Sequence, residues 1–190
     1  MPSQIRPTLV LLAFMTILTG VAYPLAITGL GQALFPIQAN GSLVVRDGVA
    51  VGSEHVGQTF SRPEYFHGRP SAAGGGYDAA NSGGTNLGPT NRTLVEAVAE
   101  RARAIAATTD SDRIPIDLVT ASGSGLDPDI SPESAYLQVS RVAKARGLSP
   151  REIREVVEAN VEQPLFGIFG KRTVNVLWLN LALDGRSPAQ

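Results

Sequence analysis

An uncharged, mostly apolar stretch near the N-terminus constrains this chain more than any other feature. No residue from Pro7 to Val45 is charged, and Thr8–Leu30 within that stretch is mostly apolar. A helix that crosses a bilayer needs about 20 such residues. The stretch therefore predicts a transmembrane helix, which we place at residues 8–32, after a short segment of residues 1–7.

Two other interpretations fit part of this stretch. The apolar core of a cleaved signal peptide usually has about 7–15 residues. Leu9–Leu18 fits that length, and Gly31-Gln32-Ala33 fits a cleavage site with small residues on both sides. A buried core helix is the third interpretation, although a helix that is apolar all round suits lipid better than a small domain. Because the apolar character continues well past Leu18, we favour an uncleaved membrane anchor.

Positive charge predicts the orientation of this anchor. Arg6 precedes it, and the next charged residue is Arg46. Basic residues concentrate on the cytoplasmic side of membrane helices, so we expect a cytoplasmic N-terminus, one membrane pass, and residues 33–190 outside the cytoplasm. The chain has no cysteine, which agrees with an oxidising compartment.

Small residues in the stretch indicate contact with other helices. Thr16 and Gly20, and then Ala22 and Ala26, form small-xxx-small pairs, which let a second helix approach closely. Pro24 removes one backbone hydrogen bond, so we expect a kink there. Glycine and proline are common in membrane helices in any case, so a lipid-facing helix without a partner is the alternative.

The rest of the chain predicts a small α+β domain. Asp47-Gly48 separates two valine-rich runs, which is typical of a β-hairpin turn. Residues 61–91 are irregular and rich in glycine and proline, but we expect Tyr65, Phe66 and Tyr77 to keep this long loop ordered.

Three further helices are predicted by residues that favour helix ends. They are Thr93–Ala107 after Asn91 or Thr90, a helix between Ser131 and Gly147, and one that starts at the capping box Ser149–Glu152 and stops at Pro164. Short apolar or alternating runs predict strands, one starting at Ile114 and one over Thr173–Leu183.

The sequence contains no recognisable catalytic or metal-binding motif. It has no G-x-x-x-x-G-K-[ST] phosphate loop and no G-x-S-x-G nucleophile turn. His55 and His67 lack an obvious carboxylate partner, and Asp127 and Asp129 lack the further ligands of a calcium loop. The net charge of -1 gives no basic surface for nucleic acid. We therefore expect no catalytic site, no metal site and no nucleic-acid partner.

Four long segments together resemble one known family. In chain order they are GQTFSRPEYFHGRPSAA, NSGGTNLGPTN, DLVTASGSGLDPDISPESAYLQVSRVAKARGL and VNVLWLNLAL. On these segments the chain resembles the C subunit of the Kdp potassium-transporting P-type ATPase of bacteria, over nearly its whole length.

The resemblance implies an accessory subunit of a high-affinity, ATP-driven potassium uptake pump in the bacterial inner membrane. It implies three partners: a channel-like potassium-binding subunit, a P-type ATP-hydrolysing subunit and a small single-span subunit. The family's C subunit is described as a catalytic chaperone that raises the ATP affinity of the catalytic subunit. The resemblance thus implies a subunit without a catalytic site of its own and without a firmly bound cofactor.

The resemblance also nominates site residues. The family's SGG sequence has been likened to an ABC-transporter signature. The residues nominated for contact with ATP, at the partner subunit, are Ser82, Gly83, Gly84, Thr85 and Asn86. A plain turn-rich loop before the next helix is the other interpretation of these residues. For the whole chain, the alternative function is a stand-alone, membrane-tethered binding module outside the cytoplasm.

Overall fold

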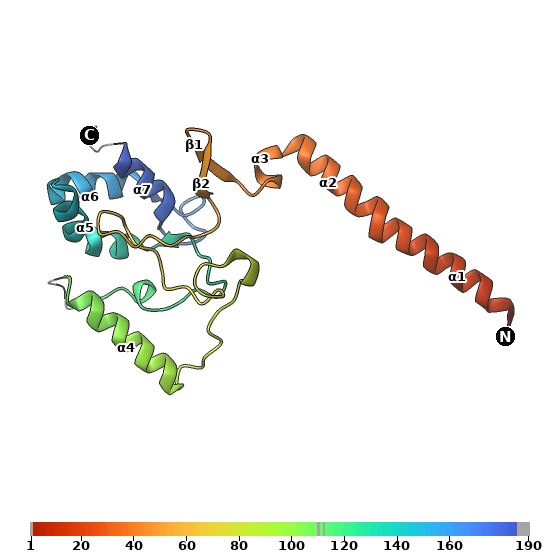
Figure 1. Cartoon of the computed structure of the whole chain (residues 1–190), viewed down its shortest axis with the longest axis horizontal. Helices are drawn as coiled ribbons and strands as arrows, with labels where there is room; N and C mark the ends of the chain where they lie inside the picture. Colours follow the sequence, from red (N-terminus) through yellow and green to blue (C-terminus); the bar gives the residue numbers. More distant parts are fainter. Residues whose placement is uncertain (1, 110, 112, 186–190) are drawn as a thin grey trace. The chain divides into compact units, whose positions relative to one another are not determined.

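The computed structural model describes residues 2–109, 111 and 113–185 (Figure 1). The chain divides into two compact units, Met1–Leu43 and Val44–Gln190. Met1 and residues 186–190, at the ends of the predicted N-terminal segment and of the predicted outer domain, lie outside the described residues. The fold class is the expected one, because an apolar N-terminal helix precedes a small α+β domain.

The first unit is one long helix followed by a single short turn of helix. Helix α1 (Pro2–Ile17) continues through a π-helical turn at Leu18–Ala22 into α2 (Tyr23–Leu34), and α3 (Pro36–Ala39) follows. The stretch Gln4–Leu34 has 31 residues, a mean hydropathy of 2.1, and no buried residue in its most apolar window. This helix is therefore long enough and apolar enough to cross a membrane.

Proline explains the irregular turn in this helix. Pro24 has no N–H to donate to the preceding turn, and the N–H of Tyr23 instead donates to the carbonyl of Leu18, five residues earlier. The kink predicted at Pro24 is therefore wrong, because the helix widens over Leu18–Ala22 instead of bending sharply. Figure 1 shows α1 and α2 continuing as one rod without a sharp bend.

The second unit begins with the predicted hairpin. Strands β1 (Leu43–Arg46) and β2 (Val49–Ser53) pair with each other. Between them Asp47 and Gly48 both have positive φ, 52° and 78°. Two successive residues of this conformation make the tight turn that matches the twist of a hairpin, so the prediction from Asp47-Gly48 is confirmed.

The core of the domain is a small antiparallel sheet with three helices against it. The strand order is β3 (Asp129–Ile130), β5 (Thr173–Asn175), β4 (Val161–Glu162). Val174 in the central strand lies opposite Ile130 on one side and Val161 on the other. The helices are α5 (Pro132–Arg146), α6 (Pro150–Ala159) and α7 (Val176–Asp184).

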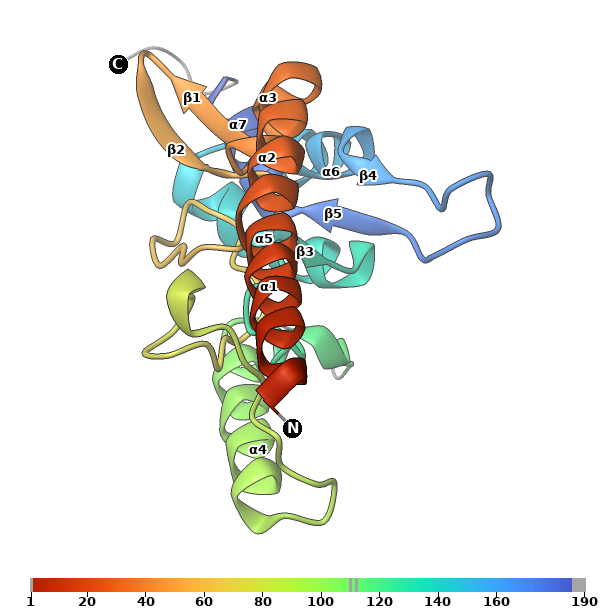
Figure 2. The same cartoon turned by 90° about the vertical axis from the view of Figure 1, so that its right-hand side faces the viewer.

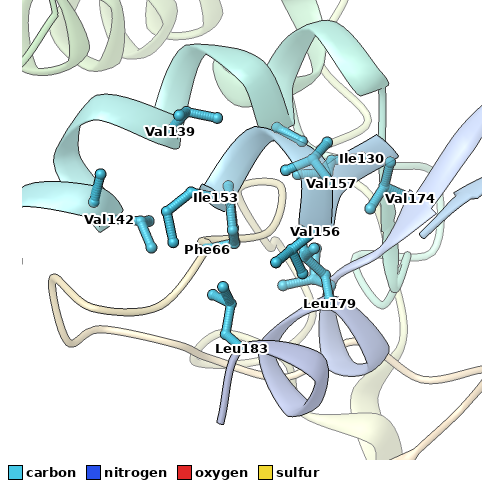
Figure 3. Close-up of a cluster of buried hydrophobic side chains, with 13 residues drawn as sticks. Phe66, Ile130, Val139, Val142, Ile153, Val156, Val157, Val174, Leu179 and Leu183 are labelled. Atoms are coloured by element: carbon cyan, nitrogen blue, oxygen red, sulfur yellow. The ribbon is translucent and has the colours of Figure 1, made fainter. Parts of the chain in front are cut away.

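One apolar cluster joins these elements, and the long loop contributes its central residue. Phe66, from the loop of residues 61–91, is 0% exposed, and Figure 3 shows it among side chains of α5, α6 and α7. The buried apolar residues of this cluster are Phe66, Ile130, Ala135, Val139, Val142, Ala143, Ile153, Val156, Val157, Val174, Val176, Leu179 and Leu183.

Two buried amide side chains hold the backbone of the loop beside this cluster. Asn180 of α7 accepts from the N–H of Phe66 (2.8 Å) and donates to its carbonyl (3.0 Å). Gln138 of α5 makes the same pair of bonds with His67, at 2.8 and 3.1 Å. The expectation of an ordered loop is confirmed at these residues.

The predicted helix caps are present. Asn91 caps α4 (Arg92–Ala106), Ser131 caps α5, and Gly147 ends α5 with a φ of 66°. Ser149 and Glu152 form the capping box of α6. This helix ends at Ala159, several residues before Pro164, because β4 begins at Val161.

Two predicted strands are wrong in whole or in part. Residues 114–119 contain a 3-10 turn, Ile116–Leu118, in which Asp117 accepts hydrogen bonds from the N–H of Ser131 and the hydroxyl of Ser134 at the start of α5. Of Thr173–Leu183, only Thr173–Asn175 is a strand and the rest is α7. A segment this apolar fits helical and alternating patterns equally, and the helix forms where the Asn175 side chain accepts from the N–H of Trp178.

We expect Phe66→Ala to lower the free energy of unfolding by about 3–5 kcal/mol, the range for removal of a buried aromatic ring. The matched control is Phe166→Ala, because Phe166 is 84% exposed and its loss should change stability by less than about 0.5 kcal/mol. Urea unfolding of the full chain in mild detergent measures both. Equal effects of the two variants would contradict the placement of Phe66 in the core.

Candidate functional site

The small residues of the long helix are all exposed in this chain. The four residues of the two pairs, Thr16, Gly20, Ala22 and Ala26, are exposed. A methyl group added at Gly20 would meet no atom of the chain within 4 Å. In a regular α-helix, residues four apart lie on nearly the same side and residues two apart lie on nearly opposite sides. The wider turn Leu18–Ala22 changes these angles but still leaves Gly20 and Ala22 on different sides. The pair Thr16 and Gly20 therefore faces a different side from the pair Ala22 and Ala26.

The loop of Ser82 to Asn86 is packed against a second loop, residues 122–125. The N–H of Gly83 donates to the carbonyl of Ser124 (2.8 Å), and the hydroxyl of Ser82 donates to the same oxygen (3.0 Å). A methyl group at Gly84 would lie 3.0 Å from the carbonyl oxygen of Gly123, closer than such contacts usually are. Close packing between the two loops thus accounts for the glycine at position 84.

The other residues of this loop are less closely packed than Gly84. A methyl group at Gly83 would meet no protein atom within 4 Å. Thr85 is exposed, and Asn86 has a φ of 53°. The sequence has no Lys, Arg or His from residue 79 to residue 91, and the next cation, Arg92, pairs with Glu96 at 2.6 Å. The loop thus offers a bound phosphate some exposed small residues, but no cation within its own segment.

A cavity of about 510 Å³ lies between α4, α5 and the segment of residues 58–77. Its lining includes apolar side chains and four basic ones, and no Asp or Glu among the described residues. The apolar and basic members are Phe60, His67, Arg69, Pro70, Tyr77, Arg101, Ala104, Ile105, Leu118, Leu137 and Arg141. Sequence analysis missed this cavity, since distant segments assemble it. The helix predicted at residues 93–107 forms one wall of the cavity, but its sequence alone does not show what lies opposite.

The arginines of the cavity fasten neighbouring segments. Arg141 donates to the carbonyls of Pro63 (2.7 Å) and Tyr65 (3.0 Å), and Arg101 donates to the carbonyl of Val119 (3.0 Å). Arg69 donates to the carboxylate of Asp127 at 2.7 Å. These hydrogen bonds join separate segments of the domain, so the three arginines have a structural role whether or not the cavity binds a ligand.

His67 has an unusual environment at the edge of this cavity. Burial lowers the pKa of its imidazole, and the nearby charge of Arg141 lowers that pKa further. Its Nε2 lies 3.1 Å from the carbonyl oxygen of Arg62, which partly opposes the shift. The predicted loop histidine is therefore a half-buried one that favours the neutral form. In the described part of the chain, no three His, Asp or Glu side chains are grouped closely enough to hold a metal ion.

Comparison with known proteins decides the family. The family described as "K+-transporting ATPase, c chain" matches residues 5–185. The chain belongs to the KdpC family.

Several relatives in the KdpC family match the chain from end to end, and each is named potassium-transporting ATPase KdpC subunit. The protein of Rhodopseudomonas palustris (strain TIE-1) is 53% identical over 200 residues, covering 99% of this chain and 100% of the relative. The protein of Caulobacter vibrioides (strain NA1000 / CB15N) is 54% identical over 189 residues, covering 99% and 96%. The protein of Variovorax paradoxus (strain S110) is 52% identical over 193 residues and is matched over its whole length.

The lowered pKa of His67 predicts how stability depends on pH. The unfolded chain, with an ordinary imidazole pKa of about 6.5, takes up a proton at a higher pH than the folded chain does. Stability contributed by the neutral form is therefore present above this value and is lost as the pH falls toward the folded pKa. NMR titration should place the pKa of His67 below 6.5, and His67→Gln should flatten the decline in stability between about pH 7 and 5. A value at or above 6.5 would contradict the environment described.

Proposed function

We propose that this chain is the non-catalytic accessory subunit of an ATP-driven potassium uptake pump, assembled in the bacterial cell membrane with three partners. These partners are a channel-like potassium-binding subunit, a P-type ATP-hydrolysing subunit and a small single-span subunit. The observation that carries the proposal is the match of residues 5–185 to the c chain of potassium-transporting ATPases. Co-purification of the full chain with a large multispan protein in mild detergent tests it, and a chain that purifies alone would favour a stand-alone binding module.

We further propose the topology predicted from the sequence. Residues 1–7 would lie in the cytoplasm, residues 8–32 would cross the membrane, and residues 33–190 would form a domain on the outer side. The long exposed apolar helix and Arg6 before the apolar stretch support this arrangement. Protease added to intact spheroplasts should then digest the domain, and digestion only after lysis would reverse the orientation.

In this arrangement the subunit affects ATP use without touching ATP. A remote subunit changes the affinity of a site only when it interacts differently with two states of the complex. We propose that the membrane helix and the contact of the domain with the channel-like subunit provide that difference. The loop from Ser82 to Asn86 would then stabilise the domain by its packing against residues 122–125. Contact of this loop with nucleotide is the competing proposal.

The helix contact is tested by Gly20→Leu. The added side chain meets nothing within the chain itself, so any effect comes from a neighbouring helix. We expect assembly to weaken by about 1–2 kcal/mol, the scale of membrane-helix contacts. Val21→Leu is the control, because it enlarges a side chain in the same widened turn that points to a different side of the helix. Dissociation of the purified complex in detergent measures both, and equal behaviour of the two variants would contradict the contact at Gly20.

The role of the glycine loop is tested by comparing two alanine substitutions. Gly84→Ala crowds the carbonyl of Gly123 and should lower stability by about 1–3 kcal/mol, with no selective change in the apparent KM for ATP. Gly83→Ala meets no protein atom and should change neither quantity. A bound phosphate, however, would be obstructed by a methyl group at Gly83. A raised KM for ATP of the complex with Gly83→Ala, at normal stability, would therefore establish the nucleotide contact.

A further inference from the structure

The connection between β4 and β5 exposes four large apolar side chains together. Leu165, Phe166, Ile168 and Phe169 are 64%, 84%, 77% and 66% exposed, and we call these four residues the apolar tip. Figure 2 shows the β4–β5 connection projecting away from the helices of the domain. Grouped exposed apolar side chains of this kind usually mark a surface that contacts another protein or a membrane.

The apolar tip is a structured turn. Leu165 and Phe169 form an antiparallel bridge, with the N–H of each donating to the carbonyl of the other at 2.9 and 3.0 Å. The N–H of Gly167 donates to the carbonyl of Pro164 (2.8 Å), and Phe166 and Gly167 have φ values of 54° and 71°. This geometry keeps the side chains pointing out from a fixed backbone, which lowers the entropy lost when they bind.

Positive charge follows the apolar tip directly. Lys171 and Arg172 are both exposed and precede β5. Glu162 of β4 lies opposite Thr173, and Asp129 of the adjacent sheet strand β3 is close enough to Lys171 for the two charges to interact. Long basic side chains beside apolar ones are typical of surfaces that meet lipid headgroups, since the cations reach phosphates while the apolar groups enter the acyl boundary.

Chain connectivity keeps the domain near the bilayer that the long helix would cross. Helix α2 ends at Leu34 and the second unit begins at Val44. The connection of residues 35–43 spans at most roughly 30 Å when fully extended. A tether of this length gives the apolar tip a high effective concentration of lipid surface.

We propose that the apolar tip inserts into the interfacial layer of the membrane that holds the chain's own helix, with Lys171 and Arg172 at anionic lipid phosphates. The proposal rests on the membrane-spanning helix of the proposed function but on none of its partner subunits. It gives the domain a second attachment to the membrane and so fixes its orientation. Lipid is the occupant that the basic residues and the short tether favour, and a protein groove is the competing occupant.

The chain's single tryptophan makes a direct test possible. With Trp178→Phe as background, one tryptophan is introduced at a time: Phe166→Trp at the apolar tip, Phe14→Trp on the long helix, and Val95→Trp at an exposed apolar position on α4. Each full chain is reconstituted without partners into vesicles of phosphatidylcholine and phosphatidylglycerol that contain brominated lipids. Brominated lipids quench tryptophan only on contact.

We expect quenching at positions 166 and 14 and none at 95. A tryptophan at 166 that is quenched no more than the one at 95 would overturn the proposal. Protection of position 166 from aqueous quenchers only after partner subunits are added would also overturn it. Absence of quenching at position 14 would instead refute the membrane-spanning helix, so the two failures are distinguishable.

The basic residues are tested in the Phe166→Trp background. The double variant Lys171→Glu and Arg172→Glu should lose severalfold in quenching by brominated lipid in anionic vesicles. Lys144→Glu, a charge reversal at an exposed site on α5, should lose nothing. Equal quenching in the Phe166→Trp chain, the double variant and the Lys144→Glu variant would contradict the proposed contact of Lys171 and Arg172 with lipid phosphates.

Discussion

The domain depends on two amide side chains that hold an irregular segment of backbone in its core. Asn180 and Gln138 each bond both backbone groups of one residue in the long loop, Phe66 and His67 respectively. Buried backbone groups without partners would cost free energy, so these bonds let an irregular segment run through the core. Phe66 can then fill the space between α5, α6 and α7. The sheet has only short strands, and the loop supplies the packing that a wider sheet would otherwise provide.

Local features of this fold could be read from the sequence, and distant pairings could not. Ser131, Ser149 and Asp47-Gly48 act on neighbouring backbone within a few residues, so their chemistry identifies helix starts and a turn directly. The sequence also indicated that aromatic residues order the long loop, but not that amides from α5 and α7 hold it. Helix α7 was missed because Val176, Leu177, Leu179 and Leu183 are all buried, and apolar residues on every side carry no single period.

The candidate site shows a related limit. The sequence alone does not distinguish Gly83 from Gly84. In the structure only Gly84 packs closely against a distant residue, Gly123. A glycine can be required by a ligand or by a neighbouring loop, and only the folded chain distinguishes the two at each position. The basic cavity is of the same kind, because Arg101 and Arg141 come from different helices and meet only in the fold. The small-residue pairs of the long helix, by contrast, follow from spacing alone.

Helix α4 is attached differently from the other helices of the domain. None of its described residues is buried, and it lies at the far end of the domain from α6 and α7 in both views (Figures 1 and 2). Segments with few buried contacts open with a smaller free energy than the global unfolding reaction. We therefore expect α4 to open at a lower free energy than the cluster around Phe66, and because α4 forms one wall of the cavity, each such opening would also expose the cavity to solvent.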